Sequence, residues 1–403
     1  MNYVQSADTM IITHEDLSPL KLIRGGSDAT WTISSATFDS VPLYPFSLSV
    51  TNPTVDITPS IVSGKIQITS SASAFASSHV NQYVNAEPQG RARILQFVSA
   101  KEVKAVTEYP FFDTSTISAG DWDLEQGYEN VWSVSRGFPK SVIFHEGRLY
   151  FGGSKSRPST IWGSKVGLFF DFKPTELLDD DAVEATLDTN QLNSIVDIMS
   201  GRDLQIFTTG GEHFVPQSST NPITPLTMIF KNVSRHGTKP GTKAIPLESG
   251  TVFVQRQGKS LNEFLFSDQQ LTYITSKISL LSGHLLKSPK RMALRRATST
   301  DEGDLLLISN DDDGSLAVFS IMRSQNVVAP SKYTTTGEFI DVNCDVQDIY
   351  VATKRTFNST NKFFIEEFND NSFTDCSFLG SVATASVTSL PHTATNVAVL
   401  TDG

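Results

Sequence analysis

The sequence contains little cysteine, few charged residues for its length and no long apolar run. Cys344 and Cys376 are its two cysteines, too few for a disulfide framework and without metal-binding spacing, so we expect buried or surface thiols in a reducing compartment. No stretch approaches about 18 consecutive apolar residues, which excludes a membrane-spanning helix. The first residues also lack the basic and apolar regions of a secretory signal. We therefore expect a soluble protein made in the cytosol.

Positive charge is also scarce. The 32 lysines and arginines are outnumbered by 43 aspartates and glutamates, which gives a net charge of −11. A surface built to grip phosphate groups needs the opposite balance. The composition therefore argues against a nucleic-acid-binding protein.

Helical patterns are rare, whereas phenylalanine, at 26 residues, is unusually common and favours strands. Short runs of β-branched and aromatic residues alternate with Gly, Asn, Asp and Ser clusters, the pattern of strands and turns. The clearest helix candidate, residues 179–198, contains poor helix formers such as Thr186 and Asp188. It predicts instead an acidic turn, an irregular segment and a strand beginning near Ile195. The chain is therefore expected to be all-β.

A strand–turn–strand unit recurs five times after residue 136. Its turns, marked by Gly147, Gly201, Gly250, Gly303 and Asp348, lie 45 to 54 residues apart. A period of about 40–50 residues with hairpin-forming strands is typical of a β-propeller, and a large sandwich array is the alternative. The strand residues expected to face neighbouring sheets are Ile143, Ile195, Ile206, Val252, Val254, Leu306 and Ile349.

These patterns predict three regions. Residues 1–28 form a lead β-hairpin, with strands at Thr9–Ile12 and Leu20–Arg24, that belongs to the propeller. Residues 29–135 are rich in Ser and Thr with short alternating stretches, which predicts an inserted small β-sandwich or barrel domain. Residues 136–403 form the propeller-like β-repeat region, which is incomplete if the chain is a piece of a longer protein.

Three motifs contain metal-ligand residue types without the spacing of a metal site. His145-Glu146 and His14-Glu15-Asp16 lack a second histidine at zinc-site spacing, so both are predicted to be solvated turns. Asn310-Asp311-Asp312-Asp313-Gly314 lacks two carboxylates of a calcium loop and predicts a turn between strands, with adventitious Ca²⁺ as the alternative. Asp179-Asp180-Asp181 is predicted to cap a helix or contact another subunit, with cation binding as the alternative.

Motifs for nucleophilic catalysis and nucleotide binding are missing. The sequence has no GxSxG and no GxxxxGK[ST], and Gly152-Gly153 and Gly210-Gly211 follow strands but lead into no clear helix. A glycosidase needs only two suitably placed carboxylates, so 43 acidic residues leave that chemistry open without supporting it. We assign no catalytic, cofactor-binding or metal-binding residue, and we expect no enzymatic activity and no cofactor.

Two short segments are basic. Lys287, Lys290, Arg291, Arg295 and Arg296 place five cations within ten residues, without interleaved aromatics that would stack on bases. We expect an exposed connector or an interface facing acidic neighbours, with a nucleic-acid strip as the alternative. Residues 154–158, Ser-Lys-Ser-Arg-Pro, predict a polar basic loop.

Residues 137–172 combine several of these features in a fixed order. They read Gly-Phe-Pro, a strand, the hairpin His145-Glu146-Gly147-Arg148-Leu149-Tyr150-Phe151-Gly152-Gly153, a Ser-Arg-Pro loop and a Trp-Gly-Ser turn before Phe-Phe-Asp-Phe. This arrangement resembles the tail nozzle family of short-tailed bacteriophages, also called tail tubular protein B. Residues 3–12, 19–24, 179–182, 207–212 and 253–258 look similar to the family as well.

The resemblance implies a structural virion protein. Such nozzles look like rings, expected here to be hexamers, at the distal end of the tail. They contact a tail adaptor protein and tail fibres and let double-stranded DNA pass without specific binding. The resemblance implies synthesis in the host bacterial cytoplasm, location in the virion tail and no membrane span. Family members usually extend before Tyr3 and beyond Thr401-Asp402-Gly403, so we expect a fragment, a truncated gene product or a minimal version.

For such a ring we expect an acidic or neutral central surface, because an acidic lumen repels phosphates. Asp179-Asp180-Asp181 and Asp311-Asp312-Asp313 are its candidate carboxylate clusters, and the five cations of residues 287–296 are expected to face a neighbour's acids. Two other functions remain open. One is a tail-associated glycan depolymerase, which needs a groove with paired carboxylates and aromatic platforms, and the other is a non-catalytic receptor-binding module.

Overall fold

The computed structural model describes residues 1–27, 29–46, 50–174, 178–188, 193–218, 222–299, 301–325, 327–357, 359–369 and 375–376. Residue 28 at the expected first boundary, residues 189–192 of the acidic segment and the end Thr401-Asp402-Gly403 lie outside these residues. The described chain is all-β, and its helical elements are three single-turn 3₁₀ segments. It divides into two units, residues 1–40 with 134–403, and Val41–Ser133.

The described part of the first unit contains five four-stranded sheets and one three-stranded sheet, each an antiparallel meander in chain order. The first sheet comprises β1 (Asn2–Ser6), β2 (Thr9–His14), β3 (Leu17–Arg24) and β4 (Trp31–Ser35). The second and third comprise β14 (Ser141–His145), β15 (Arg148–Gly152), β16 (Thr160–Gly163), β17 (Val183–Thr186), β18 (Ile195–Ser200), β19 (Leu204–Thr208), β20 (Glu212–Val215) and β21 (Lys231–Ser234).

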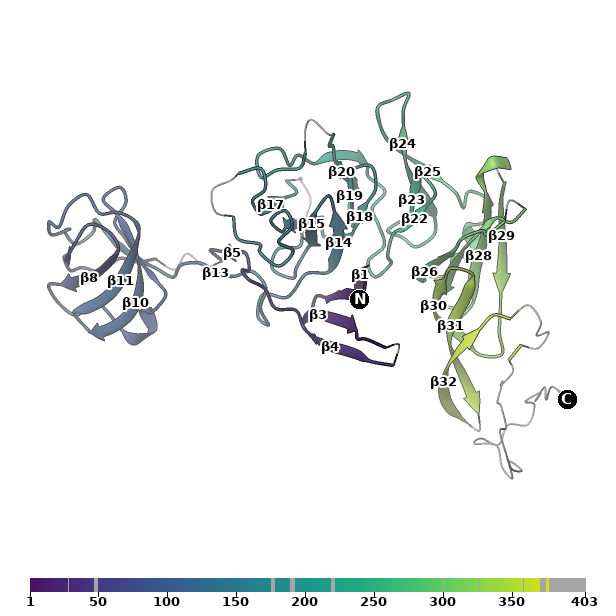
Figure 1. Cartoon of the computed structure of the whole chain (residues 1–403), viewed down its shortest axis with the longest axis horizontal. Coiled ribbons are helices and arrows are strands. Elements are labelled where there is room, and N and C mark those ends of the chain that lie inside the picture. Colours follow the sequence, from purple (N-terminus) through teal and green to yellow (C-terminus); the bar gives the residue numbers. More distant parts are fainter. Residues whose placement is uncertain are drawn as a thin grey trace. The chain divides into compact units, whose positions relative to one another are not determined.

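The remaining sheets of this unit follow in the same way (Figure 1). They comprise β22 (Ile245–Leu247), β23 (Gly250–Val254), β24 (Leu261–Ser267), β25 (Thr272–Lys277), β26 (Pro289–Arg295), β27 (Asp304–Asn310), β28 (Leu316–Met322), β29 (Val327–Tyr333), β30 (Glu338–Asp345), β31 (Asp348–Phe357) and β32 (Thr360–Glu367). A small up-and-down sheet repeated along the chain is the architecture of propeller blades. The unit is therefore propeller-like, as the hairpin repeat predicted.

Tight turns set the register of these sheets. Glu146 and Gly147, the two residues between β14 and β15, both have positive φ, at 42° and 76°. This is the backbone of a type I′ turn, whose twist matches that of the flanking strands. His145 pairs with Arg148 directly across it. The hairpins expected at Gly201, Gly250, Gly303 and Asp348 are likewise present, because each of these residues lies at or beside a turn between paired strands.

Successive sheets share apolar cores. Ile195 and Ile206 of the third sheet pack with Ile143 and Tyr150 of the second. Val252, Val254 and Leu306 lie in a core between the fourth and fifth sheets, and Ile349 lies in the core between the fifth and sixth. Because a narrow sheet cannot bury both faces alone, each blade depends on its neighbours. The prediction that these residues face neighbouring sheets is confirmed.

The sequence patterns did not predict several strands. β17 lies in the segment that we expected to be irregular, although the strand expected near Ile195 is present as β18. β26 runs through the basic segment, so its interpretation as an exposed connector is wrong. Met292 and Ala293 of β26 are buried, and the charges around them hid the strand pattern. The lead hairpin gains β1 and β4, which carries its sheet past residue 28 to Ser35.

The second unit, Val41–Ser133, is a half-barrel of seven strands in the order β6-β12-β9-β10-β11-β8-β7, beside a two-stranded pair formed by β5 and β13. Its strands are β5 (Leu43–Tyr44), β6 (Val50–Thr51), β7 (Ile57–Pro59), β8 (Lys65–Ser70), β9 (Tyr83–Asn85), β10 (Arg91–Ser99), β11 (Glu102–Tyr109), β12 (Asp123–Glu125) and β13 (Glu129–Asn130). Ile66 and Ile68 of β8 point into its core with Trp122, while Lys65 and Gln67 alternate with them on the outer face.

Phe264 tests the dependence of one sheet on the next. Its buried ring lies 4.5 Å from that of Tyr273 and 5.6 Å from that of Phe207, between the third and fourth sheets. We expect Phe264→Ala to lower the free energy of unfolding by about 3–5 kcal/mol, because it leaves a cavity in a shared core. Urea denaturation followed by tryptophan fluorescence measures this. Phe112→Ala, at a ring 72% exposed, is the control and should change little; equal effects of the two variants would contradict the shared core.

Candidate functional site

One buried carboxylate joins four segments of the first unit. Asp197 of β18 is 1% exposed. Its Oδ1 accepts hydrogen bonds from Ser141 Oγ (2.7 Å) on β14 and Asn2 Nδ2 (3.4 Å) on β1. Its Oδ2 accepts one from the backbone N–H of Ala244 (2.9 Å), just before β22. Burial raises the pKa of Asp197, and the nearby Lys243 opposes that rise.

Lys243 completes this junction. Its Nζ donates a hydrogen bond to the carbonyl of Tyr3 (3.0 Å) and lies 4.3 Å from the centre of the Tyr3 ring. Burial lowers the pKa of Lys243, and the Asp197 carboxylate raises it. A buried charge is tolerated when hydrogen bonds and a nearby opposite charge compensate it, and both buried Asp197 and half-buried Lys243 have these. The junction therefore connects the sheets, and its polar atoms form hydrogen bonds within the chain.

Arg148 and the acidic turn bind each other. The Arg148 guanidinium is buried and donates to the carbonyl oxygens of Ser164 (2.7 Å), Asp179 (2.6 Å) and Asp181. The Asp181 carboxylate accepts the N–H of Ala182 and lies 3.6 Å from a lysine ammonium. The predicted helix cap is wrong, because strand β17 follows the turn. Asp179 and Asp180 are exposed, whereas Asp181 is buried.

His145 lies in a second polar joint. We predicted a solvated turn, but the imidazole is 4% exposed because the next sheet covers it. Nδ1 lies 2.8 Å from Ser200 Oγ and Nε2 lies 2.9 Å from Gln217 Oε1. The Gln217 amide also donates to Glu146 Oε1 (3.0 Å). His145 and Glu146 therefore hold the second and third sheets together and do not form a metal site.

Glu212 is a buried acid in the third sheet. Its carboxylate accepts hydrogen bonds from Ser234 Oγ on β21 and Thr238 Oγ1 (3.2 Å) in the segment leading to β22. Burial raises the pKa of Glu212 to about 7. Next to it, burial lowers the pKa of His213, whose Nε2 has no hydrogen-bond partner within the described part of the chain. The sequence patterns did not single out either residue.

The candidate lumen carboxylates at Asp311-Asp312-Asp313 form the predicted turn between β27 and β28. Asp311 pairs with Lys290 (2.8 Å), and Asp313 pairs with Lys332 (2.9 Å). Asp312 is exposed. Two of the three carboxylates are thus already bound by cations of the same chain.

Cations of the basic segment also form ion pairs with acidic side chains of the same chain. Besides the Lys290–Asp311 pair, Arg295 lies 3.2 Å from Glu302 and Arg291 lies 3.8 Å from Asp341. These pairs are partly exposed, so each contributes about 0–1 kcal/mol. The charges expected to face a neighbour's acids are therefore satisfied in part by this chain's own acids.

The remaining motif residues have structural roles. Residues 154–158 form a loop, as predicted, and Arg157 pairs with Glu184 of β17. His14 is half-buried, and its Nδ1 accepts the N–H of Asp16. At Gly152 a side chain would collide with Ile198 of the next sheet, which explains the glycine without a nucleotide. Both cysteines are half-buried free thiols.

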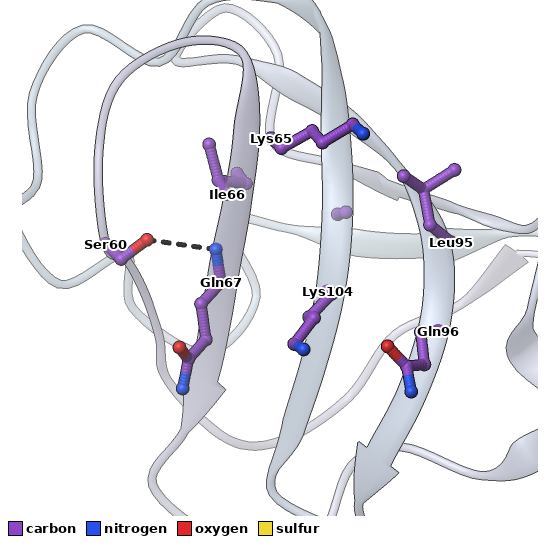
Figure 2. Close-up of a pocket in the computed structure, with 8 residues that line it drawn as sticks. Ser60, Lys65, Ile66, Gln67, Leu95, Gln96 and Lys104 are labelled. Atoms are coloured by element: carbon purple, nitrogen blue, oxygen red, sulfur yellow. Dashed lines mark hydrogen bonds between the residues drawn. The ribbon is translucent and has the colours of Figure 1, made fainter.

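Two of the hollows on the described surface are lined partly by charged side chains. The larger, about 440 Å³, lies on the outer face of the second unit and is bordered by Lys65, Gln67, Gln96 and Lys104 (Figure 2). It carries no carboxylate among its lining residues, so it lacks the pair that glycoside hydrolysis needs. The smaller lies on the first sheet, where its acid, Asp8, pairs with Arg24. Within the described residues, no three His, Cys, Asp or Glu side chains are arranged to hold a metal ion.

The two terminal sheets of the first unit each expose apolar side chains. On β32, Phe363 is 70% and Ile365 84% exposed. Trp31 and Ile33 of β4 are 55% and 61% exposed. In the described chain, no helix has the length and apolarity needed to cross a bilayer.

Comparison with known proteins identifies no family. No family model and no curated protein matches the chain. A structure of a protein from Lactobacillus plantarum is 11% identical, with a TM-score of 0.37, and the match covers 87% of this chain and 91% of the other. The β-propeller domain of Cps50 (Swd1) from Myceliophteria thermophila is 9% identical, with a TM-score of 0.35, covering 73% and 84%.

A GH43 β-1,3-galactosidase is 8% identical, with a TM-score of 0.28, and the match covers 58% of this chain and 92% of the galactosidase. Because all three TM-scores lie below 0.5, the propeller-like assignment rests on the order and packing of the chain's own sheets. Enzymes and non-enzymes share such folds, so function depends on the local sites.

Glu212 predicts a pH dependence of stability. A carboxyl whose pKa rises from 4.5 when unfolded to about 7 when folded holds its proton more tightly in the native state. Stability is then highest below pH 4.5 for this group and falls by about 3 kcal/mol as pH rises to 7. We expect Glu212→Gln to remove this decline and to raise the melting temperature at pH 8. The measurement is the difference between melting curves of variant and parent from pH 4 to 8.

The exposed Glu367→Gln is the control for this comparison, and its difference curve should be flat. A Glu212→Gln variant that is less stable than the parent at pH 8 would show that the buried carboxylate stabilises the sheet junction in its charged form.

Proposed function

We propose that the chain is a structural subunit of a phage tail nozzle, a ring through which DNA leaves the particle. The proposal begins from the resemblance of residues 137–172 to that family. In the structure, Arg148 and His145 from this segment connect neighbouring elements and line neither of the two hollows described above. A protein whose distinctive polar residues hold its own sheets together is suited to a scaffolding role, and we propose no catalytic activity.

The exposed apolar face of the last sheet carries the argument for assembly. One face of β31 is buried through Ile349 and Val351, whereas Phe363 and Ile365 on β32 are mostly exposed. Adjacent apolar side chains left open on a sheet mark a surface that a partner covers. A ring subunit supplies such a partner in the form of its neighbour. Because surface ion pairs contribute little, buried apolar area must supply most of the stability of the ring.

The charge distribution is compatible with passage of DNA. The net charge of −11 disfavours any tight grip on phosphate groups. Asp179, Asp180 and Asp312 are exposed carboxylates available to a central surface. The basic segment, which could have held DNA, has Lys290, Arg291 and Arg295 close to acids of the same chain. A duplex could therefore slide past such a ring without being retained.

Assembly is tested by replacing the exposed apolar pair. We expect the purified chain to form rings visible by negative-stain imaging and to sediment as an oligomer, with modest weakening in high salt. Phe363→Ser with Ile365→Ser should shift the protein to monomers, because it removes apolar area from the contact. Sedimentation velocity measures the shift, and a circular dichroism spectrum that matches the parent's shows that the fold survives.

Leu271→Ser with Leu281→Ser is the matched control, since these side chains are 78% and 92% exposed but lie away from β32. The control should remain oligomeric. A parent chain that stays monomeric at high micromolar concentration would refute the ring, and dissociation of both double variants alike would refute the assignment of the contact to β32.

Weak binding of DNA is a separate expectation. A 30-base-pair duplex should show little retardation with micromolar protein at any salt concentration, because the acidic chain repels phosphates. Electrophoretic mobility shifts across a salt series measure this. Tight binding whose affinity falls steeply as salt rises would show that the cations of residues 287–296 grip phosphates.

A further inference from the structure

The larger hollow is built across three adjacent strands of the second unit. Gln67 of β8, Lys104 of β11 and Gln96 of β10 are cross-strand neighbours in one row. Figure 2 shows these three side chains lying next to one another on the same face, with Lys65 and Leu95 further along. The volume of about 440 Å³ falls within the usual range of ligand-binding pockets.

A β-bulge turns an extra side chain toward this hollow. The pairing of β10 with β11 shifts between Ile94 and Gln96, so Leu95 has no cross-strand partner. Ile94 points into the core, while Leu95 and Gln96 are both exposed. In a regular strand Gln96 would face the core. Bulges commonly redirect a side chain beside a functional site, and here the bulge places an amide beside Lys104.

The same face carries most of the positively charged side chains of the second unit, which is acidic overall. Val41–Ser133 contains five lysines and arginines against nine aspartates and glutamates. Lys65, Arg93 and Lys104 lie together on this face, because Lys65 and Arg93 both pair with Val106, one row from Lys104. None of the three forms an ion pair with another described residue. Arg91, further along β10, is held by Glu108 and Glu125. The glutamates on the same face of β11 lie at its two ends.

We propose that this hollow binds a short stretch of an acidic polysaccharide. The ammonium groups of Lys65 and Lys104 would pair with sugar carboxylates. The amides of Gln67 and Gln96 each offer a donor and an acceptor, which suits the hydroxyl groups between those carboxylates. Leu95 would contact the apolar face of a sugar ring. This site is independent of the ring proposed above and would give the inserted domain a binding role.

Nucleic acid fits the hollow less well. None of the eight lining residues is aromatic, so bases have no platform on which to stack. Duplex DNA carries about one negative charge per 1.7 Å of axis, which a domain with an excess of acids repels. A uronate polymer spaces its charges by whole sugar units and presents hydroxyl groups between them. The paired amides therefore favour the sugar polymer.

The test uses isothermal titration of the full chain with hexagalacturonate, with maltohexaose as the neutral ligand of equal length and a twelve-nucleotide thymidine oligomer as the phosphate ligand. We expect hexagalacturonate to bind at millimolar concentration or below and the other two to bind at least about tenfold more weakly. Lys104→Gln should weaken hexagalacturonate binding about tenfold, which is the usual effect of losing one charge-assisted hydrogen bond.

Lys101→Gln is the matched control, because it removes the same charge from the same domain at the β10–β11 turn, outside the hollow. It should change affinity less than twofold. Gln96→Ala should also weaken hexagalacturonate binding, since it removes the amide without changing the charge. The proposal is wrong if hexagalacturonate does not bind, if the two lysine variants act alike, or if the thymidine oligomer binds as well as the sugar.

Discussion

A four-stranded sheet has two faces and cannot bury either of them by itself, and the first unit is organised by that constraint. The third and fourth sheets share the rings of Phe207, Phe253 and Phe264, and the fourth and fifth share another core around Leu306. Every inner sheet thereby becomes a partner of two others. The terminal sheets lack a second partner on the described chain, which leaves Phe363 and Ile365 open. The dependence of each sheet on a neighbour thus leaves apolar side chains exposed on the last sheet.

Polar side chains make this stacking specific. Apolar cores alone tolerate sliding of one sheet over another, but the Asp197 carboxylate accepts hydrogen bonds from three different segments at fixed positions. Arg148 fixes the acidic turn through backbone carbonyls, and His145 links two sheets through Ser200 and Gln217. An error in register would leave a buried charge without partners, which costs more than the joint contributes. These residues therefore specify one arrangement among many apolar alternatives.

Local patterns were sufficient to predict the hairpins, because a turn such as Glu146-Gly147 and the alternation around it lie within one short segment. They failed where burial depends on distant partners. His145 looked solvated because Ser200 and Gln217, which cover it, lie more than fifty residues away. The charges of β26 concealed its strand pattern, because the acids that pair with them lie in a distant turn and in another strand, at Asp311 and Asp341. The hollow of the second unit depends on a β-bulge at Leu95, and the residue types around Leu95 do not indicate a bulge.

The pairing of β5 with β13 brings together the strands at the beginning and end of the inserted domain, Leu43 beside Asn130 and Tyr44 beside Glu129. Because the two ends of this domain lie side by side, the domain can be inserted at a single point of the chain. Evolution can then lengthen, shorten or exchange the domain while the blades before and after it keep their spacing. The second unit and the repeated sheets can thus change at different rates within one polypeptide.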